Sequence, residues 1–212
     1  MKDFPVFDTE NGVASLVLRE IPYTQKAYIK ILDTQSPEAL LDECRQFCTM
    51  VGAEHIYASG DVSLEKYPLY TKINELERIW QEIPCTDASV ILVDEGNLSQ
   101  WKDIYNSKMI TVPNAAYMDN AAAKGMLRDG SGYFVKRNDQ IVGIAKGAGD
   151  TIEAIASTVP GAGASVLFAL CRQLGGERFR LQVADANIRA MALYERLGFV
   201  KSKEISSWYK IL

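Results

Sequence analysis

Residues 185–199, DANIRAMALYERLGF, carry the clearest structural signal in the chain. They predict a helix with a capping signal at each end. Asp185 or Asn187 can accept hydrogen bonds from the first turn, and Gly198 can adopt the left-handed conformation that ends a helix. We expect Phe199 to fold back onto the last turn. The side chains expected to face the core are Ile188, Met191 and Leu197. The residues alone fit either a well-capped helix before an edge strand or part of a functional site.

Short apolar runs and helical patterns alternate upstream of this helix. Strands are expected at 89–94, 132–136, 141–148, 151–157 and 179–184, with a strand-like tail over 199–212. Helices are expected near 98–107, 115–128 and 163–174. Pro84 precedes all of these elements, and we therefore expect two domains, residues 1–84 and residues 85–212.

The first 84 residues contain a shorter set of similar elements. A helix is expected from Pro37, after a potential cap at Ser36, to Gly52. Residues 64–83 are ambiguous: apolar and polar residues alternate around 67–73, and the rest fits either a short helix or a strand. Strands are expected at 13–20, 27–32 and 55–59. The text ECRQF followed by GAEHIYASGD resembles LCRQL followed by GGERFRLQVAD in the C-terminal half, and two strands precede each copy. This weak internal similarity predicts a degenerate duplication.

The composition is that of a globular protein and excludes several classes. Apolar residues make up 48% and charged residues 24% of the 212 residues, which is enough to build a core. The formal net charge is −4, from 27 acidic and 23 basic side chains, and no Lys/Arg run suggests nucleic-acid binding. The start, MKDFPVFDTENG, lacks the apolar run of a signal peptide, and the apolar stretches are strand-length. We therefore expect a cytoplasmic protein without nucleic-acid or membrane partners.

The cysteines and the single histidine argue against metal and hydrolase chemistry. Cys44, Cys48, Cys85 and Cys171 form no cluster with metal-ligand spacing, so we expect buried, reduced thiols and no metal. A histidine-based triad would have to use His55, with a serine that no motif identifies. We therefore expect a structural role for this histidine, which lies in a strand-like run.

The segment 185–199 also carries the main functional indication. Its pattern N-x-x-A-x-x-L-Y-E-x-x-G-F resembles the closing motif of the GNAT superfamily, the acyl-CoA-dependent N-acetyltransferases, and the order of elements over 85–212 follows that family. The matching residues are Asn187, Ala190, Leu193, Tyr194, Glu195, Gly198 and Phe199. The resemblance implies an α+β fold: a mixed, mostly antiparallel sheet flanked by helices and split between its fourth and fifth strands, where acyl-CoA binds. Residues 1–84 would form a partial GNAT-like subdomain without a cofactor loop.

In this family the loop from the fourth strand into the next helix cradles the CoA pyrophosphate, and it corresponds here to VPGAGASVL, residues 159–167. Small residues let backbone N–H groups approach a phosphate, and the helix N-terminus adds positive potential. The cofactor-binding residues that the resemblance implies are Ser157, Val159, Gly161, Ala162, Gly163, Ala164, Ser165, Asn187 and Tyr194. The loop departs from the family pattern of Arg or Gln, two residues, Gly, one residue, then Gly or Ala, because Pro160 precedes the first glycine and no basic residue lies within 153–171. The alternatives are a glycine turn that only starts the helix and a capping role for Ser165.

The resemblance implies two catalytic residues. Tyr194 matches the family tyrosine that protonates the departing CoA thiolate, and a phenol with a pKa of about 10 can donate to a thiolate whose acid has a pKa of about 8.5. Glu153 lies on the fourth strand, where many members carry the carboxylate that deprotonates the amine, directly or through water. Asp150 is the second candidate for this base. The alternatives are a core position for the tyrosine and a solvated sheet face for the glutamate.

These features predict an acyl-CoA N-acyltransferase that transfers acetyl from acetyl-CoA to a primary amine of a small molecule or a peptide. A backbone N–H of the fourth strand would polarise the thioester carbonyl. The alternative is a catalytically silent GNAT-fold module that binds a ligand or a protein. The depleted loop favours the silent module, whereas Asn187 and Tyr194 favour the enzyme. The sequence leaves the acceptor open, and also the oligomeric state, a homodimer included.

Overall fold

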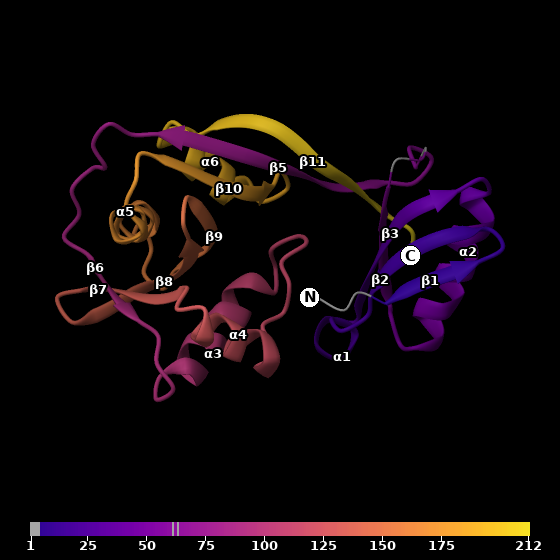
Figure 1. Cartoon of the computed structure of the whole chain (residues 1–212), viewed down its shortest axis with the longest axis horizontal. Helices are drawn as coiled ribbons and strands as arrows, with labels where there is room; N and C mark the ends of the chain where they lie inside the picture. Colours follow the sequence, from indigo (N-terminus) through magenta and orange to yellow (C-terminus); the bar gives the residue numbers. More distant parts are fainter. Residues whose placement is uncertain (1–4, 61, 63) are drawn as a thin grey trace. The chain divides into compact units, whose positions relative to one another are not determined.

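The computed structural model describes residues 5–60, 62 and 64–212, and the chain forms two compact units (Figure 1). The first unit combines Met1–Ile73 with Glu204–Leu212, and the second is Asn74–Lys203. Two long strands, β5 (Leu69–Ile79) and β11 (Val200–Lys210), contribute residues to both units. The chain therefore passes from one unit to the other within a strand, once in each direction.

The first unit is a sheet with a crossover helix. In spatial order its strands are β1 (Val6–Thr9), β2 (Gly12–Val17), β3 (Lys26–Thr34) and β4 (His55–Ser59), followed by the end of β11. Neighbours are antiparallel except β3 and β4, which are parallel and are joined through α2 (Pro37–Met50). A single helical turn, α1 (Ile21–Thr24), connects β2 to β3. The two strands, helix and strand that the sequence predicts are therefore present, and their origin by duplication stays a prediction.

Helix α2 starts and stops at local signals. Pro37 takes a first-turn position behind the N-cap Ser36, and Gly52 adopts a φ of 98° just after the helix. The Ser36 side chain makes no cap hydrogen bond, contrary to the expected cap; its backbone N–H instead donates to Thr34 Oγ1 at 2.9 Å. The helix buries one apolar face, which includes Leu40. Sequence therefore determines the limits of α2 without a side-chain cap.

Three of the four cysteines are buried, as predicted, and the fourth is not. Cys44, Cys48 and Cys171 are free thiols inside the cores, where burial raises their pKa values to about 12, 11 and 12. Cys85 is free but exposed, because it lies in the connection between β5 and β6 rather than in an element with an apolar face. His55 is the exposed first residue of β4.

The second unit holds a mixed sheet with both parallel and antiparallel pairs. The order is β11-β5-β10-β9-β8-β7-β6, with parallel pairing between β9 and β10 and antiparallel pairing from β9 to β6. Its other strands are β6 (Ser89–Leu92), β7 (Gly132–Arg137), β8 (Gln140–Ala148), β9 (Thr151–Ser157) and β10 (Arg178–Ala184). Its helices are α3 (Leu98–Met109), α4 (Asn120–Arg128), α5 (Gly163–Leu174) and α6 (Ile188–Arg196).

Each face of this sheet carries a hydrophobic cluster. Helix α5 lies on one side of β7 and β8, and helices α3 and α4 lie on the other (Figure 1). The larger joins α5 and α6 to the strands and contains Leu170 and Phe179. The smaller joins α3 and α4 to the other face and contains Trp101. Neighbouring residues of β8 divide between them, with Ala145 in the larger cluster and Ile144 in the smaller, as the alternation of side chains along a strand requires. The unit is thus a sheet between two helical layers.

The helix expected at 115–128 starts later, at Asn120. Asp119 is its N-cap, and the carboxylate accepts a hydrogen bond of 2.7 Å from the N–H three residues on. The residues before it are held outside the helix by Asn106, whose side chain bonds to the N–H and the carbonyl of Met118 at 2.8 and 3.0 Å. This tertiary contact outweighs the helix propensity of the alanines in the segment.

The ambiguous segment 64–83 contains one long strand, β5. Its buried positions are Thr71, Asn74 and Leu76, spaced by three residues and then two. The apolar-polar alternation over 67–73 indicates the first part of this strand, but it does not continue, because two of the three buried residues are polar and their spacing changes. The full length of the strand therefore follows from its neighbours in the sheet.

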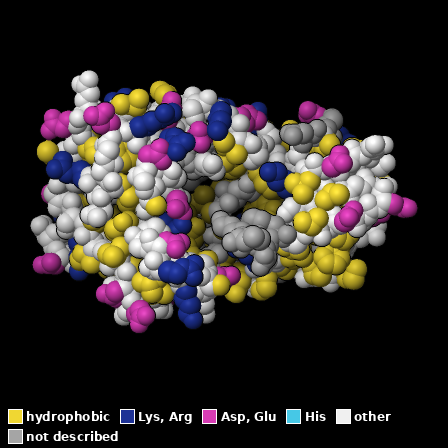
Figure 2. All heavy atoms as spheres, viewed as in Figure 1, with side chains coloured by type: hydrophobic (Ala, Val, Ile, Leu, Met, Phe, Trp, Pro, Cys, Tyr) yellow, Lys and Arg dark blue, Asp and Glu magenta, His cyan; other side chains and the backbone are white. Residues whose placement is uncertain are grey.

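Charged side chains of both signs are interspersed on the face shown in Figure 2. This distribution accompanies the formal net charge of −4. Among the helices of the described residues, none combines the length and the apolar character needed to cross a membrane.

Candidate active site

Strands β9 and β10 are joined at one end only. Within the described residues they pair at Thr151–Arg180 and Ile152–Leu181, and the Arg180 N–H donates to the Asp150 carbonyl at 2.8 Å. Among the described residues, both strands continue beyond these two pairs but no longer pair with each other. Counted from β6, these are the fourth and fifth strands, so the sheet is split where the sequence predicts.

Glu153 occupies a bulge in β9 at this fork. Lys146 and Gly147 are consecutive in β8 but pair with Ala154 and Ile152, so Glu153 has no residue opposite. A bulge bends its strand and takes a backbone group out of the regular ladder, and bulges are frequent beside active sites. The Glu153 carboxylate forms an ion pair with the Lys146 ammonium, and the two side chains are 39% and 21% exposed. The candidate base therefore lies at the fork but is already paired with a cation.

Asp150, the second candidate base, is also paired. Its carboxylate accepts two hydrogen bonds from the Arg180 guanidinium, at 2.9 and 3.0 Å, and a third from Thr151 Oγ1 at 3.1 Å. The contact with Arg180 is the main cause that lowers the pKa of Asp150 below its ordinary value. A carboxylate stabilised in its charged form is a weak base, so this residue fits a structural role at the fork better than proton transfer.

The loop after β9 turns tightly into α5. Thr158 ties it to β8, with its N–H on the Val142 carbonyl at 2.9 Å and its hydroxyl on the Ile141 carbonyl at 2.8 Å. Gly161 has a φ of 80°, and the N-cap Ala162 makes no side-chain cap hydrogen bond. The N–H groups of the first helical turn have no partners within a helix, so they point from its end. The loop therefore offers backbone donors to a ligand.

The predicted loop residues divide between backbone and packing positions. Ser157 ends β9 opposite Gly143, and Val159 packs, partly buried, against the cluster under α5 and α6. The N-cap Ala162 is buried. Gly163 has a packing reason of its own, because a Cβ there would lie 3.0 Å from Leu193 Cδ2 on α6. The remaining predicted positions, Ala164 and Ser165, are half-buried in the first turn of α5.

One residue beside this loop has no signal in the linear sequence. Arg137, at the end of β7, donates from Nη2 to Ser165 Oγ at 2.6 Å and from Nε to Asp87 Oδ1 at 2.9 Å. It therefore places a guanidinium beside the first turn of α5. Ser165 accepts this bond, and α5 has no side-chain cap, so the capping alternative for Ser165 is wrong.

Helix α6 has a capping residue at each end, as the sequence predicts. Asn187 is the N-cap and accepts from the Ala190 N–H at 3.3 Å. At the other end Gly198 has a φ of 78°, and the Phe199 N–H donates to the Tyr194 carbonyl at 3.0 Å, which closes the helix. The expected core position of Ile188 is wrong: as the first helical residue it is 71% exposed. Met191 and Leu197 pack against the core as expected.

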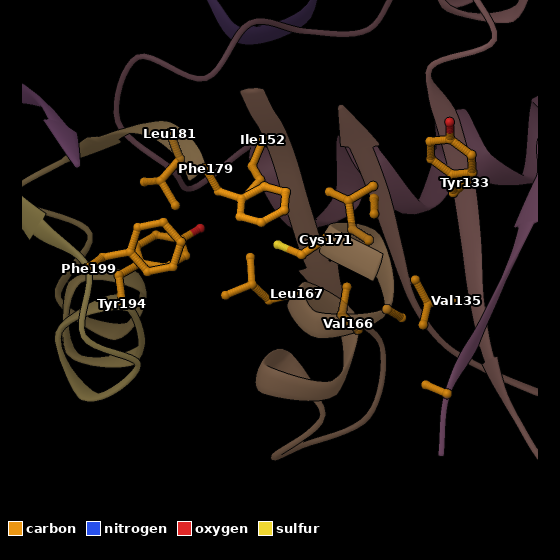
Figure 3. Packing of buried hydrophobic residues seen from close by; sticks show 14 of the residues in the cluster. Tyr133, Val135, Ile152, Val166, Leu167, Cys171, Phe179, Leu181, Tyr194 and Phe199 are labelled. Atoms are coloured by element: carbon orange, nitrogen blue, oxygen red, sulfur yellow. The ribbon is translucent and has the colours of Figure 1, made fainter. Parts of the chain in front are cut away.

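Tyr194 lies in the core between α6 and α5 and is 7% exposed. Its ring is tilted against Phe199, with the centroids 5.7 Å apart, and its hydroxyl points toward the Cys171 thiol (Figure 3). Burial, and to a smaller extent Cys171, raise the pKa of the phenol well above its ordinary value. The hydroxyl is therefore protonated at every physiological pH, as a proton donor must be, but it is a weaker acid than an exposed tyrosine.

The predicted residues thus gather on three neighbouring parts of the second unit. Glu153 and Asp150 lie at the fork of β9 and β10, the small residues form the turn into α5, and Tyr194 lies behind α5. The described residues contain no group of three or more His, Cys, Asp or Glu side chains that could hold a metal ion.

Comparison with known proteins identifies the fold. No protein-family model matches the sequence, and no curated protein sequence does either. In contrast, 131 chains of solved structures match. A functionally unknown conserved protein from Staphylococcus epidermidis has 13% identity over 98% of this chain and 93% of its own, with a TM-score of 0.61.

Two further matches are described as acetyltransferases. A GCN5-related N-acetyltransferase from Sphaerobacter thermophilus has 13% identity over 93% of this chain and 75% of its own, with a TM-score of 0.59. A putative acetyltransferase from Pyrococcus horikoshii has 14% identity over 95% of this chain and 69% of its own, with a TM-score of 0.58. The chain therefore has the fold of the GNAT superfamily, as the motif in 185–199 predicts.

Proposed function

We propose that this protein is an acyl-CoA N-acyltransferase that transfers acetyl from acetyl-CoA to a primary amine of a small molecule or peptide. The observation that carries the proposal is the incomplete pairing of β9 and β10, which stop pairing after Ile152 and Leu181. Strand edges with unmade hydrogen bonds are costly unless another group bonds to them. The amide groups of a pantetheine arm suit this place.

The residues around the fork fit an acyl-CoA. The turn at Gly161 and the first-turn N–H groups of Gly163, Ala164 and Ser165 would hold the pyrophosphate, because they combine backbone donors with the positive end of α5. Acyl-CoA supplies an activated acyl group as a thioester. The chain's task is then to orient that group and the amine and to move protons.

The bulge in β9 supplies the polarising group in this proposal. Its backbone N–H at Glu153 lies outside the ladder with β8, so it can donate to the oxygen on which negative charge develops. The Glu153 carboxylate accepts the proton of the attacking amine, directly or through water. The Lys146 ion pair holds this carboxylate in place between turnovers. Asp150 holds the fork through Arg180.

Tyr194 is the proposed proton donor to the departing thiolate. Its hydroxyl stays protonated, and α6 carries it on the same side of the sheet as α5. To act, the hydroxyl must turn from Cys171 toward the fork. Asn187 contributes by capping the helix that positions the tyrosine.

The buried position of Tyr194 also favours a second candidate function, a catalytically silent module that binds a ligand through the same fold. In that case the hydroxyl stays beside Cys171 and contributes only to packing. The loop 159–165 carries no basic side chain, in agreement with this candidate.

A binding and turnover experiment separates these functions. Acetyl-CoA should raise the unfolding temperature, since a ligand that binds only the native state stabilises it. A panel of primary amines should then release free CoA thiol from acetyl-CoA. Stabilisation without thiol release from any amine would support the silent module. A protein that acetyl-CoA does not stabilise would contradict both candidates as acyl-CoA proteins.

A further inference from the structure

Arg137 holds an unusual electrostatic position at the start of α5. Its guanidinium is bonded to Ser165, the third residue of the helix, and to Asp87. The N-terminus of a helix carries partial positive charge, and cations are favoured at the opposite end. The guanidinium and the first turn of α5 therefore repel each other, and helix stability gives no reason for the contact.

The present partners of Arg137 compensate this charge only in part. Asp87 is 66% exposed, and an exposed ion pair contributes little to stability. The Arg137 side chain itself is 33% exposed, so an incoming group can reach it. A guanidinium has five N–H donors, and Nη1 has no partner among the described residues. An anion beside the first turn would satisfy both the guanidinium and the helix end.

To bind a phosphate with a charged side chain, the loop beside Arg137 needs a cation from another part of the chain. Residues 153–171 contain no Lys or Arg, and the Thr158 hydroxyl is already bonded to the Ile141 carbonyl. The hairpin that carries Arg137 is held beside the loop, because β8 follows it and accepts the Thr158 N–H at Val142. A cation from the β7–β8 hairpin can therefore complete a phosphate site that the loop leaves neutral.

We propose that Arg137 binds the pyrophosphate of acyl-CoA in place of a basic residue in the loop. The inference rests on the proposed function and adds to it the residue that recognises the cofactor's charge. On binding, the guanidinium exchanges its exposed contact with Asp87 for phosphate oxygens, which a planar fork of donors matches well. Ser165 holds the side chain in place until the phosphate arrives.

Isothermal titration of acetyl-CoA tests this role. Arg137→Gln should weaken binding about 10- to 100-fold, the range expected for the loss of hydrogen bonds to a charged group. Arg137→Lys should recover part of the loss, and Asp87→Asn should leave affinity unchanged or increased, because it frees the guanidinium. The matched control is Arg172→Gln, in the last turn of α5. This variant should bind acetyl-CoA as tightly as the wild type does. Circular dichroism melts establish that each variant is folded.

Truncated ligands identify the phosphate. Acetyl-pantetheine lacks the pyrophosphate, so wild type and Arg137→Gln should bind it equally. Acetyl-dephospho-CoA lacks only the 3′-phosphate and should show the same loss on substitution as acetyl-CoA. If the loss disappears with this ligand, Arg137 binds the 3′-phosphate and the assignment is wrong. Equal affinity of wild type and folded Arg137→Gln for acetyl-CoA would overturn the inference but leave the proposed function intact, whereas a wild type that does not bind acetyl-CoA would contradict both.

Discussion

The Asp150 carboxylate receives two hydrogen bonds from the Arg180 guanidinium, at 2.9 and 3.0 Å, at the paired end of β9 and β10. The Arg180 N–H also donates to the Asp150 carbonyl, so side chains and backbone close the fork together. The two residues thus hold the strands together just before the pair Ile152–Leu181, after which the strands diverge. Beyond this pair the described residues of β9 and β10 no longer pair with each other, and the next residue of β9 is Glu153, in the bulge.

We predict that this pair makes stability depend on acid. Because Arg180 lowers the pKa of Asp150 in the folded protein, the contribution is present above the unfolded value of about 3.9 and is lost as the pH falls through the folded value. NMR titration should find Asp150 below its ordinary pKa in the wild type and near it in Arg180→Gln. An Asp150 pKa that is unchanged by this substitution would show that the ion pair does not persist in solution.

The four thiols should differ sharply in reactivity. Burial raises the pKa of Cys44, Cys48 and Cys171, which leaves very little thiolate, whereas Cys85 is exposed. Ellman's reagent should modify Cys85 alone in the native protein and all thiols in denaturant. Cys85→Ser should leave no rapidly reacting thiol. Rapid modification of this variant under native conditions would mean that the cores open easily.

Glu153→Gln should separate catalysis from binding. If Glu153 accepts the proton of the amine, kcat/KM should fall on the order of 10² to 10⁴-fold, with little change in acetyl-CoA affinity. The loss should shrink at higher pH, because more of the acceptor is then present as free amine. Asp150→Asn is the comparison, and we expect it to retain more activity. A larger loss in that variant than in Glu153→Gln would assign the base to Asp150.

Tyr194→Phe tests the proposed proton donor. The change removes one oxygen from a buried ring, so helix α6 should stay folded and acetyl-CoA affinity should stay close to that of the wild type. Turnover should fall on the order of 10²-fold, and the loss should be smaller for acyl donors with a more acidic leaving thiol. Since the pKa of Tyr194 is raised, its deprotonation should not limit the rate up to about pH 10.

Tyr133→Phe is the matched control, because this hydroxyl donates to the Gly130 carbonyl at 3.2 Å and lies outside the proposed site. Its turnover should be that of the wild type. Full activity in folded Tyr194→Phe would leave Tyr194 as a packing residue beside Cys171. An equal loss for all acyl donors would have the same meaning, since it indicates a structural effect.

The elements that sequence predicts well carry their own start and stop signals. Strand β9 and helix α5 have the predicted limits. Helix α6 ends at Arg196, just before Gly198, whose positive φ suits a glycine. Elements whose limits depend on contacts distant in sequence are harder to predict. The start of α4 depends on Asn106, and β5 buries polar residues whose spacing breaks the alternation over 67–73. Local chemistry determines element limits only where no tertiary contact competes.

The candidate site shows the same division. The Gly/Ala turn and Tyr194 are visible in the sequence because each belongs to a motif. The pairing of Glu153 with Lys146 and the approach of Arg137 to Ser165 join different elements of the sheet and α5, so no spacing in the chain reveals them. The orientation of the Tyr194 hydroxyl toward Cys171 likewise follows from how α6 packs on α5 (Figure 3).

A crystal structure with CoA bound tests the central claim most directly, that the fork of β9 and β10 is an acyl-CoA site. We predict that the pantetheine arm lies between these strands, with the pyrophosphate over residues 161–165 and within hydrogen-bond distance of Arg137. The pairs Thr151–Arg180 and Ile152–Leu181 should persist in that structure. A cofactor bound elsewhere, or β9 and β10 paired along their length in saturating CoA, would contradict the account.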